Sequence, residues 1–453
     1  MEAAEPLGVK IQEDLLAIPK FGKGIGLHRM LALCRTLLQT DWLSNLDAIK
    51  ITGSNGKGSV CAMVAAVFGE LSISCGLYTS PHLIKFNERI VTNGEPIADA
   101  ELAEAVAWFI QQRDEYASRF PDDTIGAFEA FTAIALHHFA GKRPRVLVSE
   151  AGIGGRYDST RIIPGKIVGL TSLDLEHTGL LGSTLEMIAY DKADLCPPGG
   201  VIIAGAIDAD VLRRLQAYCT LRNVTLRAAA AHSQVRRVVF GDTHMEVDLT
   251  IDGVDLPALQ MAVQGYHQIT NLVVATLLVR QWLQAHEPRI SPEQLTHALR
   301  CAMRSLSWPG RFERIATNPD IFIDVGHTPE AIAATVRTAQ TALRGKRILL
   351  VTGVSYDKDV EGIVKGLLPM ADAVICTRAH HKGSPPEKIL RIVQRARPEL
   401  AASLAPTIEE AMRMARAQAV ENQMTVMVAG GLFLSIEAVE ALRGNDPRSL
   451  HFF

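Results

Sequence analysis

The chain has 453 residues, longer than one hydrophobic core usually serves, so two domains are expected. Hydrophobic residues make up 48% of it and charged residues 21%, which excludes an intrinsically disordered chain and is ordinary for a soluble enzyme. The formal net charge of -3 gives no overall electrostatic reason to expect nucleic acid or an anionic membrane as a partner.

Cysteine usage and the N-terminal sequence predict a cytoplasmic protein. The seven cysteines form no C-x-x-C pair and are widely scattered, which fits reduced thiols better than a disulfide framework. Residues 1–10 are acidic and lack the basic-then-apolar form of a signal peptide. No apolar run is long enough to predict a membrane span.

Strand-length apolar runs alternate with longer helical patterns in the first two thirds of the chain. The run at 46–52 precedes a helical pattern at 60–68, and further strands are predicted at 145–149, 167–172 and 200–205. This rhythm predicts βαβ units and a mostly parallel sheet. From 225 to 262, short segments in which apolar and polar residues alternate predict an antiparallel ribbon or edge sheet. Helices are predicted to follow at 268–287 and 291–304.

The segment S-W-P-G-R-F-E-R at 307–314 places Pro and Gly between a helix and a new strand, and it predicts a domain boundary. Beyond it, strands are predicted at 319–325, 347–353, 373–377 and 425–431, again alternating with helices. The fold class predicted is α/β with two doubly wound domains. We assign 1–306 to the first domain, 307–314 to a hinge and 315–453 to the second.

The turn I-T-G-S-N-G-K-G-S at 51–59 lies between a predicted strand and a predicted helix. This is the arrangement in which backbone N–H groups and a helix N-terminus hold phosphate. Lys57 would reach the outer phosphates and Ser59 would ligate magnesium. The pattern departs from G-x-x-x-x-G-K-[ST], because Ile51 stands at the first glycine position and Gly58 separates Lys57 from Ser59. A glycine turn without a binding role is the alternative.

Three further segments place candidate catalytic or metal-binding side chains at predicted strand ends or on a predicted helix. Glu150 ends the strand at 145–149 as a candidate magnesium ligand or general base, and Asp174, Glu176 and His177 follow the strand at 167–172. Lys192 lies on a predicted helix beginning near residue 183, whose periodicity turns it inward. Taken singly, each has a structural alternative: a hydrogen-bonded turn carboxylate, a structural histidine, or a snorkelling lysine.

The order and spacing of the motifs strongly resemble the folylpolyglutamate synthase/dihydrofolate synthase family, the folate branch of the Mur ligases. The resemblance covers nearly the whole chain. It rests on G-I-G-L-H-R-M at 24–30, G-S-N-G-K-G-S at 53–59, T-S-P-H-L at 79–83, N-E-R-I at 87–90, F-E-A-F-T at 128–132, E-A-G-I-G-G-R-Y-D-S-T at 150–160, G-Y-H-Q-I-T-N at 265–271, S-W-P-G-R-F-E at 307–313, D-V-G-H-T-P at 324–329, Y-D-K-D at 356–359 and A-G-G-L-F-L at 429–434.

The resemblance implies a P-loop ATPase domain followed by a smaller Rossmann-like domain, with ATP clamped between them. The implied nucleotide-binding residues are Gly53, Asn55, Gly56, Lys57, Gly58, Ser59, Asn271, Arg311, Asp324 and His327. The implied magnesium ligands are Ser59, Ser80, Glu150, His177 and a carbamylated Lys192, and the implied catalytic residues are Lys57, Glu150, His177 and Lys192. The implied substrate-binding residues are Phe128, Glu129, Tyr157, Asp158 and Ser159.

The reaction implied is ATP-dependent amide ligation, in which a carboxylate forms an acyl phosphate that an amino acid, glutamate in the family, then captures. The protein is expected to bind small molecules only and to be a monomer. The family's G-R-L-D-A-T-N reads G-R-Y-D-S-T-R here, with Tyr157, Ser159 and Arg161. Asp194 replaces a glycine close to Lys192, where an extra acid can alter metal binding or carbamylation, and Thr328 replaces an asparagine.

These departures leave the identity of the acceptor open. A folate-type ligase is the first hypothesis, a related ligase acting on a non-folate carboxylate is the second, and a nucleotide-binding protein without ligase activity is the third. A basic loop around His380 and His381, with Arg378 and Lys382, is either a binding loop for an anionic tail or a solvated surface loop.

Overall fold

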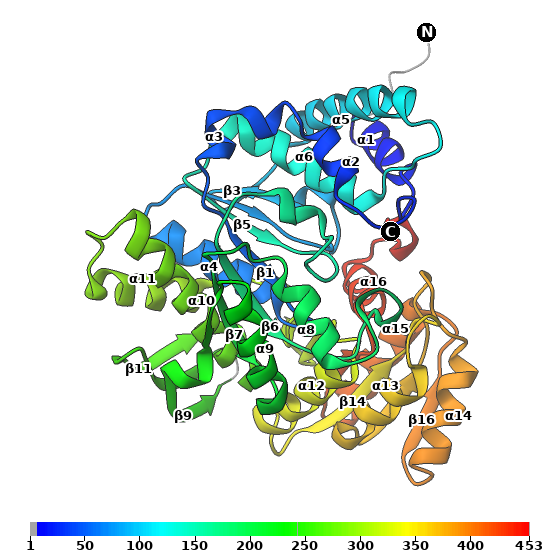
Figure 1. Ribbon diagram of the computed structural model, residues 1–453. Helices are drawn as coiled ribbons and strands as arrows, with labels where there is room; N and C mark the ends of the chain where they lie inside the picture. The colour runs from blue at the N-terminus through cyan, green and yellow to red at the C-terminus, as the bar shows by residue number, and fades with distance from the viewer. Residues whose placement is uncertain (1–6, 242, 453) are drawn as a thin grey trace.

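The computed structural model describes residues 7–241 and 243–452 (Figure 1). The first six residues of the N-terminal segment analysed for a signal peptide lie outside the described residues. Among the residues that are described, no helix combines the length and the apolar composition needed to cross a bilayer.

The first domain is built on an eight-stranded sheet with strand order β4-β3-β2-β5-β1-β6-β7-β8. Its strands are β1 Ile49–Thr52, β2 Cys75–Tyr78, β3 Ile90–Thr92, β4 Glu95–Pro96, β5 Val146–Glu150, β6 Ile167–Ser172, β7 Val201–Ala206 and β8 Thr225–Ala228. The strands from β2 to β8 in this order pair in parallel, and β3 and β4 add an antiparallel edge. The predicted mostly parallel sheet is therefore confirmed.

Helices cover both faces of this sheet. Helices α4 Lys57–Glu70, α10 Tyr266–His286 and α11 Pro292–Ser305 share one apolar core with the sheet, in which Phe68 meets Trp282 edge to face. The opposite face is covered by α1 Leu7–Leu16, α2 His28–Leu33, α5 Asp99–Arg119, α6 Ala127–Lys142, α8 Leu185–Ala193 and α9 Ala209–Leu221. The short helices α3 Asp41–Ser44 and α7 Thr178–Leu181 complete the domain.

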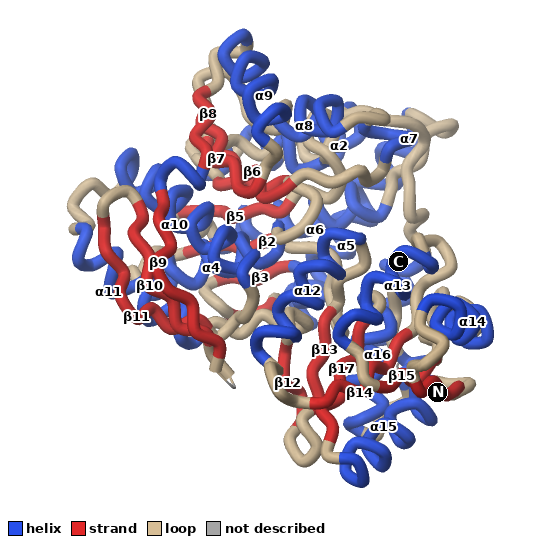
Figure 2. Tube along the Cα trace, turned by 90° about the horizontal axis from the view of Figure 1, so that it is seen from below, coloured by secondary structure: helices blue, strands red, loops and turns tan. Residues whose placement is uncertain are grey.

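A separate three-stranded antiparallel sheet lies beside α10 and α11 (Figure 2). Its strands are β9 Ser233–Phe240, β10 Met245–Ile251 and β11 Val254–Met261. This sheet is the antiparallel ribbon expected from 225–262. The start of that segment is not part of the ribbon: it forms β8, which pairs in parallel with β7 at the edge of the large sheet.

The second domain has a six-stranded sheet of order β12-β13-β17-β14-β15-β16. Its strands are β12 Glu313–Ala316, β13 Ile321–Asp324, β14 Arg347–Thr352, β15 Ala373–Cys376, β16 Ala401–Leu404 and β17 Met424–Ala429. Helices α12 Pro329–Ala342, α13 Val360–Leu367 and α14 Pro386–Ala396 pack on one face, and α15 Ile408–Asn422 and α16 Leu432–Arg443 pack on the other. Both domains are doubly wound, as predicted.

The carboxyl ends of β1, β5 and β6 face the second domain, and this arrangement positions the site. Thr328, the N-cap of α12, donates from Oγ1 to Asn55 Oδ1 at 3.2 Å across the domain boundary. Strand β12 begins at Glu313, inside the segment expected to be a hinge. The glycine turn at 51–59 therefore lies where the two domains meet, at the carboxyl edge of the sheet, where ligands bind in parallel sheets.

Candidate active site

The turn between β1 and α4 needs its glycines. Gly56 has a φ of +86°, and a Cβ built on it would lie 2.7 Å from Asn271 Oδ1. A Cβ on Gly53, whose φ is +140°, would lie 2.0 Å from Thr171 Oγ1. The backbone of the turn therefore passes close to its neighbours, with positive φ angles that are strained for residues other than glycine. Helix α4 begins directly after the turn, and the N–H groups of its first turn have no partner within the helix.

Lys57 folds back over this turn. Its Nζ donates to the carbonyl oxygens of Gly53 at 2.9 Å and Ser54 at 3.2 Å. Ser59, the third residue of α4, is buried, and Gln268 Nε2 donates to its Oγ at 3.4 Å. The turn thus presents a cation and helix N–H groups together, which is the composition of an anion site.

Two polar atoms of residues adjacent to Ser54 or hydrogen-bonded to it are buried without a hydrogen-bond partner. They are Asn55 Nδ2, a donor, and Asp174 Oδ2, an acceptor. The backbone N–H of Asp174 donates to Ser54 Oγ at 2.9 Å, which ties this carboxylate to the turn. Because buried polar atoms are nearly always paired, this open donor and acceptor indicate a site built for a polar ligand.

Glu150 lies beside the turn, at the end of β5. The strand register places it opposite Ile51, and its Oε2 accepts a hydrogen bond from the Ser80 N–H at 3.0 Å. Burial raises the pKa of Glu150, and the charge of Lys57 opposes that rise. A buried carboxylate near a lysine would be stabilised further by a bound cation.

Lys192 and Glu176 form a buried ion pair next to these groups. Lys192 is 1% exposed, and its Nζ lies 3.0 Å from Glu176 Oε1. Burial and the charge of Lys57 lower the pKa of Lys192, although Glu176 opposes them. His177 lies on the same loop with φ +46°, and partial burial lowers its pKa. Sequence reasoning noted Glu176 only as a member of an acidic segment, because its partner lies 16 residues away on a helix.

The glycine loop after Glu150 is organised by two carboxylates. Asp158 accepts from the N–H groups of Gly152 at 2.8 Å and Ile153 at 3.0 Å, and from Thr160 Oγ1 at 2.6 Å. Asp191 on α8 accepts from the Gly155 N–H at 2.9 Å. The Asp158 carboxylate thus holds its own loop together, and its substrate contact stays a prediction.

Glu129, also expected to bind substrate, forms hydrogen bonds within the first domain. Arg29 Nε donates to its two oxygens at 2.8 and 3.0 Å, and the Gly126 N–H donates to Oε2 at 2.8 Å. The carboxylate therefore caps α6 and neutralises a buried arginine. Arg29 also pairs with Asp123, 3.0 Å from its Nη1, so removing Arg29 would leave the Glu129 carboxylate without its cation.

The other expected substrate residues differ in their exposure. Phe128 packs against Gly152 and stacks on Tyr78, with ring centroids 6.0 Å apart. Ser159 is buried, whereas Tyr157 is 53% exposed. Tyr157 is therefore available to a ligand approaching the glycine loop.

Asp194 is paired with groups other than Lys192. Its carboxylate lies 2.6 Å from Arg156 Nε and 2.8 Å from Arg222 Nη1, and Tyr218 donates to it at 2.8 Å. The effect of this extra acid on metal binding or carbamylation at Lys192 stays a prediction. Two guanidinium groups neutralise Asp194, and the pair with Arg156 ties the end of α8 to the glycine loop.

The second domain contributes the remaining expected nucleotide residues. Asp324 accepts from the N–H groups of Phe312 at 3.0 Å and Gly326 at 2.8 Å, and from Thr335 Oγ1 at 2.8 Å. It therefore organises the start of this domain. Burial lowers the pKa of Arg311, while Asp324 from one domain and Glu150 from the other oppose that effect. His327, which precedes the N-cap of α12, is exposed.

Trp308, within the expected hinge, packs against Gly58 at the start of α4, a contact that was not predicted from the sequence. A Cβ on Gly58 would lie 3.0 Å from its ring, so the hinge packs directly on α4. The Trp308 Nε1–H is buried without a hydrogen-bond partner. The signal for this contact was the glycine at position 58, which lets an aromatic ring approach the helix backbone.

The predicted magnesium ligands lie around the same turn but do not form a preassembled cage. Across residues 7–241 and 243–452, no group of three or more His, Cys, Asp or Glu side chains is arranged to hold a metal ion. The expected set fits this finding, because it includes hydroxyl groups and a lysine. Magnesium usually takes few protein ligands and keeps several waters, so an open set of Glu150 and nearby hydroxyls suits it.

Lys50 is a buried cation that braces the site from within β1. It is 2% exposed, and its Nζ donates to the carbonyl oxygens of Ile163 and Leu195, each at 3.2 Å. These carbonyls follow the glycine loop and the helix of Lys192, respectively. Burial lowers the pKa of Lys50 to about 8 from an ordinary value of 10.5.

A stability measurement against pH tests this environment. Between about pH 8 and 10.5 the unfolded chain binds the Lys50 proton more readily than the folded one, so folding is favoured as pH rises. The unfolding free energy of the wild type minus that of Lys50→Met should rise by up to about 3 kcal/mol over this range. Denaturant titrations check it, with exposed Lys166→Met as control. A flat or falling difference would contradict the environment described.

Comparison with known proteins agrees with this architecture. A family model described as Mur ligase, glutamate ligase domain, matches residues 310–432. The chain is 31% identical over 320 residues to the folylpolyglutamate synthase of Lacticaseibacillus casei, covering 69% of this chain and 72% of that protein. The structure of Mycobacterium tuberculosis folylpolyglutamate synthase complexed with ADP and AMPPCP matches with a TM-score of 0.86 at 26% identity, over 97% of this chain and 99% of the other.

A longer relative shows the same similarity over part of its length. The chain is 32% identical over 397 residues, 86% of its length, to a probable bifunctional folylpolyglutamate synthase/dihydropteroate synthase of Halobacterium salinarum. It spans 46% of that relative, or about half. The identity to the Lacticaseibacillus casei protein, over most of both chains, decides the assignment: the chain belongs to the folylpolyglutamate synthase/dihydrofolate synthase family.

Proposed function

We propose that this chain is an ATP-dependent ligase that joins L-glutamate to a folate-type carboxylate through an acyl phosphate. The observation that carries the proposal is the grouping of Lys57, buried Glu150 and the Lys192–Glu176 ion pair at one edge of the sheet. A cationic turn beside buried acids suits a triphosphate and its divalent ions. The names of the relatives support the same activity.

The turn residues would hold ATP. The N–H groups at the start of α4 and the Lys57 ammonium would bind its phosphates, and the unpaired Asn55 Nδ2 would gain an acceptor. Asn271, which lies against Gly56, and Arg311 from beyond the hinge would complete the nucleotide site. The remaining residues proposed to support nucleotide binding are Gly53, Gly58, Ser59, Asp324 and His327.

Magnesium would be held by Ser59, Ser80, Glu150, His177 and a carbamylated Lys192, and when bound it would neutralise negative charge on the phosphates. The lowered pKa of Lys192 favours its neutral amine, the form that attacks carbon dioxide. The new C–N bond releases one proton and converts the side chain into an anionic oxygen ligand of the kind magnesium prefers.

The reaction proposed has two displacements. An acceptor carboxylate oxygen attacks the γ-phosphorus of ATP and ADP leaves, with Lys57 stabilising the charge that develops on the phosphoryl oxygens. The glutamate amine then attacks the acyl carbon, phosphate leaves, and the amine loses a proton. The chain's own residues bind, orient and neutralise charge, so no protein nucleophile is required.

The domain division proposed for this mechanism is 1–306 and 315–453, joined by a hinge at 307–314. Trp308 and Arg311 in the hinge approach Gly58 and Glu150 of the first domain, respectively. Movement of the hinge would therefore move groups of the nucleotide site directly. Closure around ATP would exclude water from the acyl phosphate.

For the carboxylate that accepts the glutamate there is a second candidate, a non-folate carboxylate. The observation that favours it is the exposed Tyr157 ring on a loop tied down by the Arg156–Asp194 ion pair. In the folate hypothesis, Phe128, Tyr157 and Ser159 would line the pterin side of the site. Glu129 and Asp158 would support the same wall from behind.

Phosphate release from ATP distinguishes the candidates. The protein would be assayed with glutamate plus dihydropteroate, with glutamate plus tetrahydrofolate, and with glutamate alone. Release that depends on either pterin, with a glutamylated product detected by mass spectrometry, is expected. The folate assignment fails if neither pterin stimulates release while a different carboxylic acid does.

We further propose that the protein acts as a monomer in the cytoplasm on small molecules, without nucleic-acid or membrane partners. The formal net charge of -3 supports the absence of a polyanionic partner. Light scattering during size-exclusion chromatography tests the oligomeric state. A mass of twice the chain would contradict it.

A further inference from the structure

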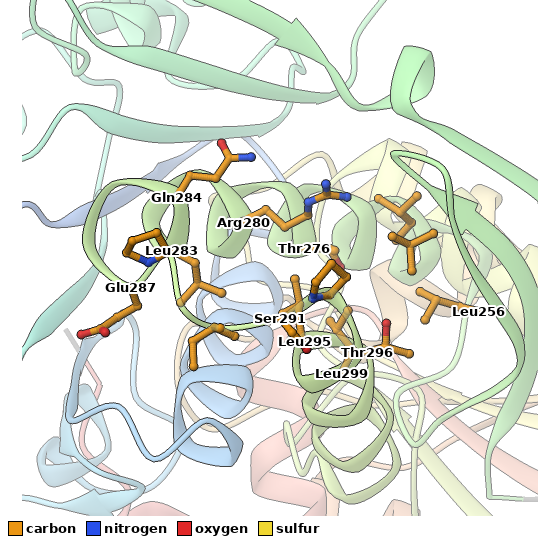
Figure 3. Close-up of a pocket in the computed structure, with 15 residues that line it drawn as sticks. Leu256, Thr276, Arg280, Leu283, Gln284, Glu287, Ser291, Leu295, Thr296 and Leu299 are labelled. Atoms are coloured by element: carbon orange, nitrogen blue, oxygen red, sulfur yellow. The ribbon is translucent and has the colours of Figure 1, made fainter.

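A cavity separate from the candidate active site lies between α10, α11 and the β10–β11 hairpin (Figure 3). Its volume is about 240 Å³. Aliphatic side chains make most of its wall, among them Ile251, Leu256, Leu283, Leu295 and Leu299. Apolar cavities of about 150 Å³ are known to take up a benzene-sized molecule, so this one has room for a larger apolar body.

One cationic side chain, Arg280 on α10, forms part of the wall. Its Nη1 is buried and has no hydrogen-bond partner, and the Asp252 carboxylate lies 3.6 Å from it. That carboxylate already accepts from His232 Nδ1 at 2.7 Å and Arg227 Nη2 at 3.3 Å. Two guanidinium groups therefore share one carboxylate, which leaves an excess of positive charge at this end.

The acid in the cavity wall, Glu287, does not neutralise this excess. Glu287 lies 2.7 Å from Arg145 Nη2 and is thus paired from outside the cavity. Figure 3 shows Arg280 extending along α10 beside Thr276, whereas Leu295 and Leu299 come from α11. The cavity therefore combines an apolar body with a cationic end.

From this combination we propose that the cavity binds a small amphipathic carboxylate, with its apolar part between α10 and α11 and its carboxylate at Arg280. A carboxylate would give the guanidinium a charge-assisted hydrogen-bond partner, and the aliphatic walls would cover the rest of the ligand. The neutral counterpart of such a ligand would contact the apolar walls but would give Arg280 no charged hydrogen-bond partner.

The cavity is distinct from the nucleotide site although both use α10. Asn271, which contacts the phosphate turn, lies nine residues before Arg280 on this helix. At 1.5 Å per residue, the two positions are about 14 Å apart along the axis. A ligand in the cavity would therefore not compete with a nucleotide.

Calorimetric titration of the full chain with octanoate and with 1-octanol tests the proposal. Octanoate is expected to bind the wild type at least about tenfold more tightly than the alcohol, because hydrogen bonds to a charged group add stabilisation. Saturating AMPPCP should leave octanoate binding unchanged. Equal affinity for both probes, failure of octanoate to bind, or its displacement by AMPPCP would overturn the proposal.

Variants provide a second, independent readout. Arg280→Met keeps the bulk of the side chain and should remove the preference for octanoate while keeping 1-octanol binding. Leu295→Trp should fill the cavity and weaken both probes. Arg413→Met, on the exposed face of α15, is the charge-matched control and should behave as wild type. Thermal melts establish that each variant is folded, and an undiminished preference in folded Arg280→Met would refute the role of Arg280.

Discussion

Replacing Lys57 with alanine is expected to lower kcat/KM by about two to three orders of magnitude, with little change in thermal stability. The ammonium lies on the Gly53 and Ser54 carbonyls, where it would meet the phosphates of ATP. Loss of one preorganised charge that stabilises a transition state typically costs this much. Initial rates of ATP-dependent phosphate release, measured with a saturating acceptor, check the prediction.

The control for this experiment is Lys142→Ala. Lys142 is a partly exposed lysine at the far end of α6, paired with Glu101 on the surface. It should retain wild-type rates, since exposed ion pairs contribute little. If folded Lys57→Ala turned over like the control, the phosphate-binding role of the turn would have to be abandoned.

Lys192→Ala is expected to reduce turnover by at least about a hundredfold, an effect that small carboxylates should partly reverse. The substitution removes the side chain that we propose becomes a carbamate, and it leaves space beside Glu176. Acetate or formate supplied in solution can then provide the missing anionic oxygens. Activity would be titrated against acetate concentration for the variant and the wild type.

A spectroscopic test separates carbamylation from a purely structural ion pair. With ¹³C-bicarbonate, the wild type should show a carbamate carbon signal by NMR, and Lys192→Ala should not. Exposed Lys166→Ala is the matched control and should keep the signal. Wild-type protein without such a signal, together with no response of Lys192→Ala to acetate, would leave Lys192 as the structural partner of Glu176.

The fold was largely predictable because its signals are local. The apolar run at 46–52 became β1 Ile49–Thr52, and the helical pattern after the glycine turn became α4. The alternation from 225 to 262 was harder to interpret. Its first strand joined the parallel sheet as β8, because local periodicity does not specify which strand a segment will pair with.

The expected site residues were harder to assign individually. Glu129 and Asp158 belong to the motifs that carry the family resemblance, yet their carboxylates are engaged by Arg29 and by the glycine loop, respectively. Arg29 lies 100 residues from Glu129 in the chain. No spacing rule in one sequence reveals a partner at that distance.

The amino-acid sequence by itself determined the alternation of strands and helices, the glycine turn that precedes α4 and the order of motifs that places the chain in its family. These are properties of short segments, set by backbone freedom and hydrophobic periodicity. Only the tertiary structure decided how the charges are paired: Lys192 with Glu176, Asp194 with Arg156, and Lys50 with two carbonyls. The energy of a buried charge depends on whichever groups folding brings within a few ångströms of it, and those groups come from distant parts of the chain.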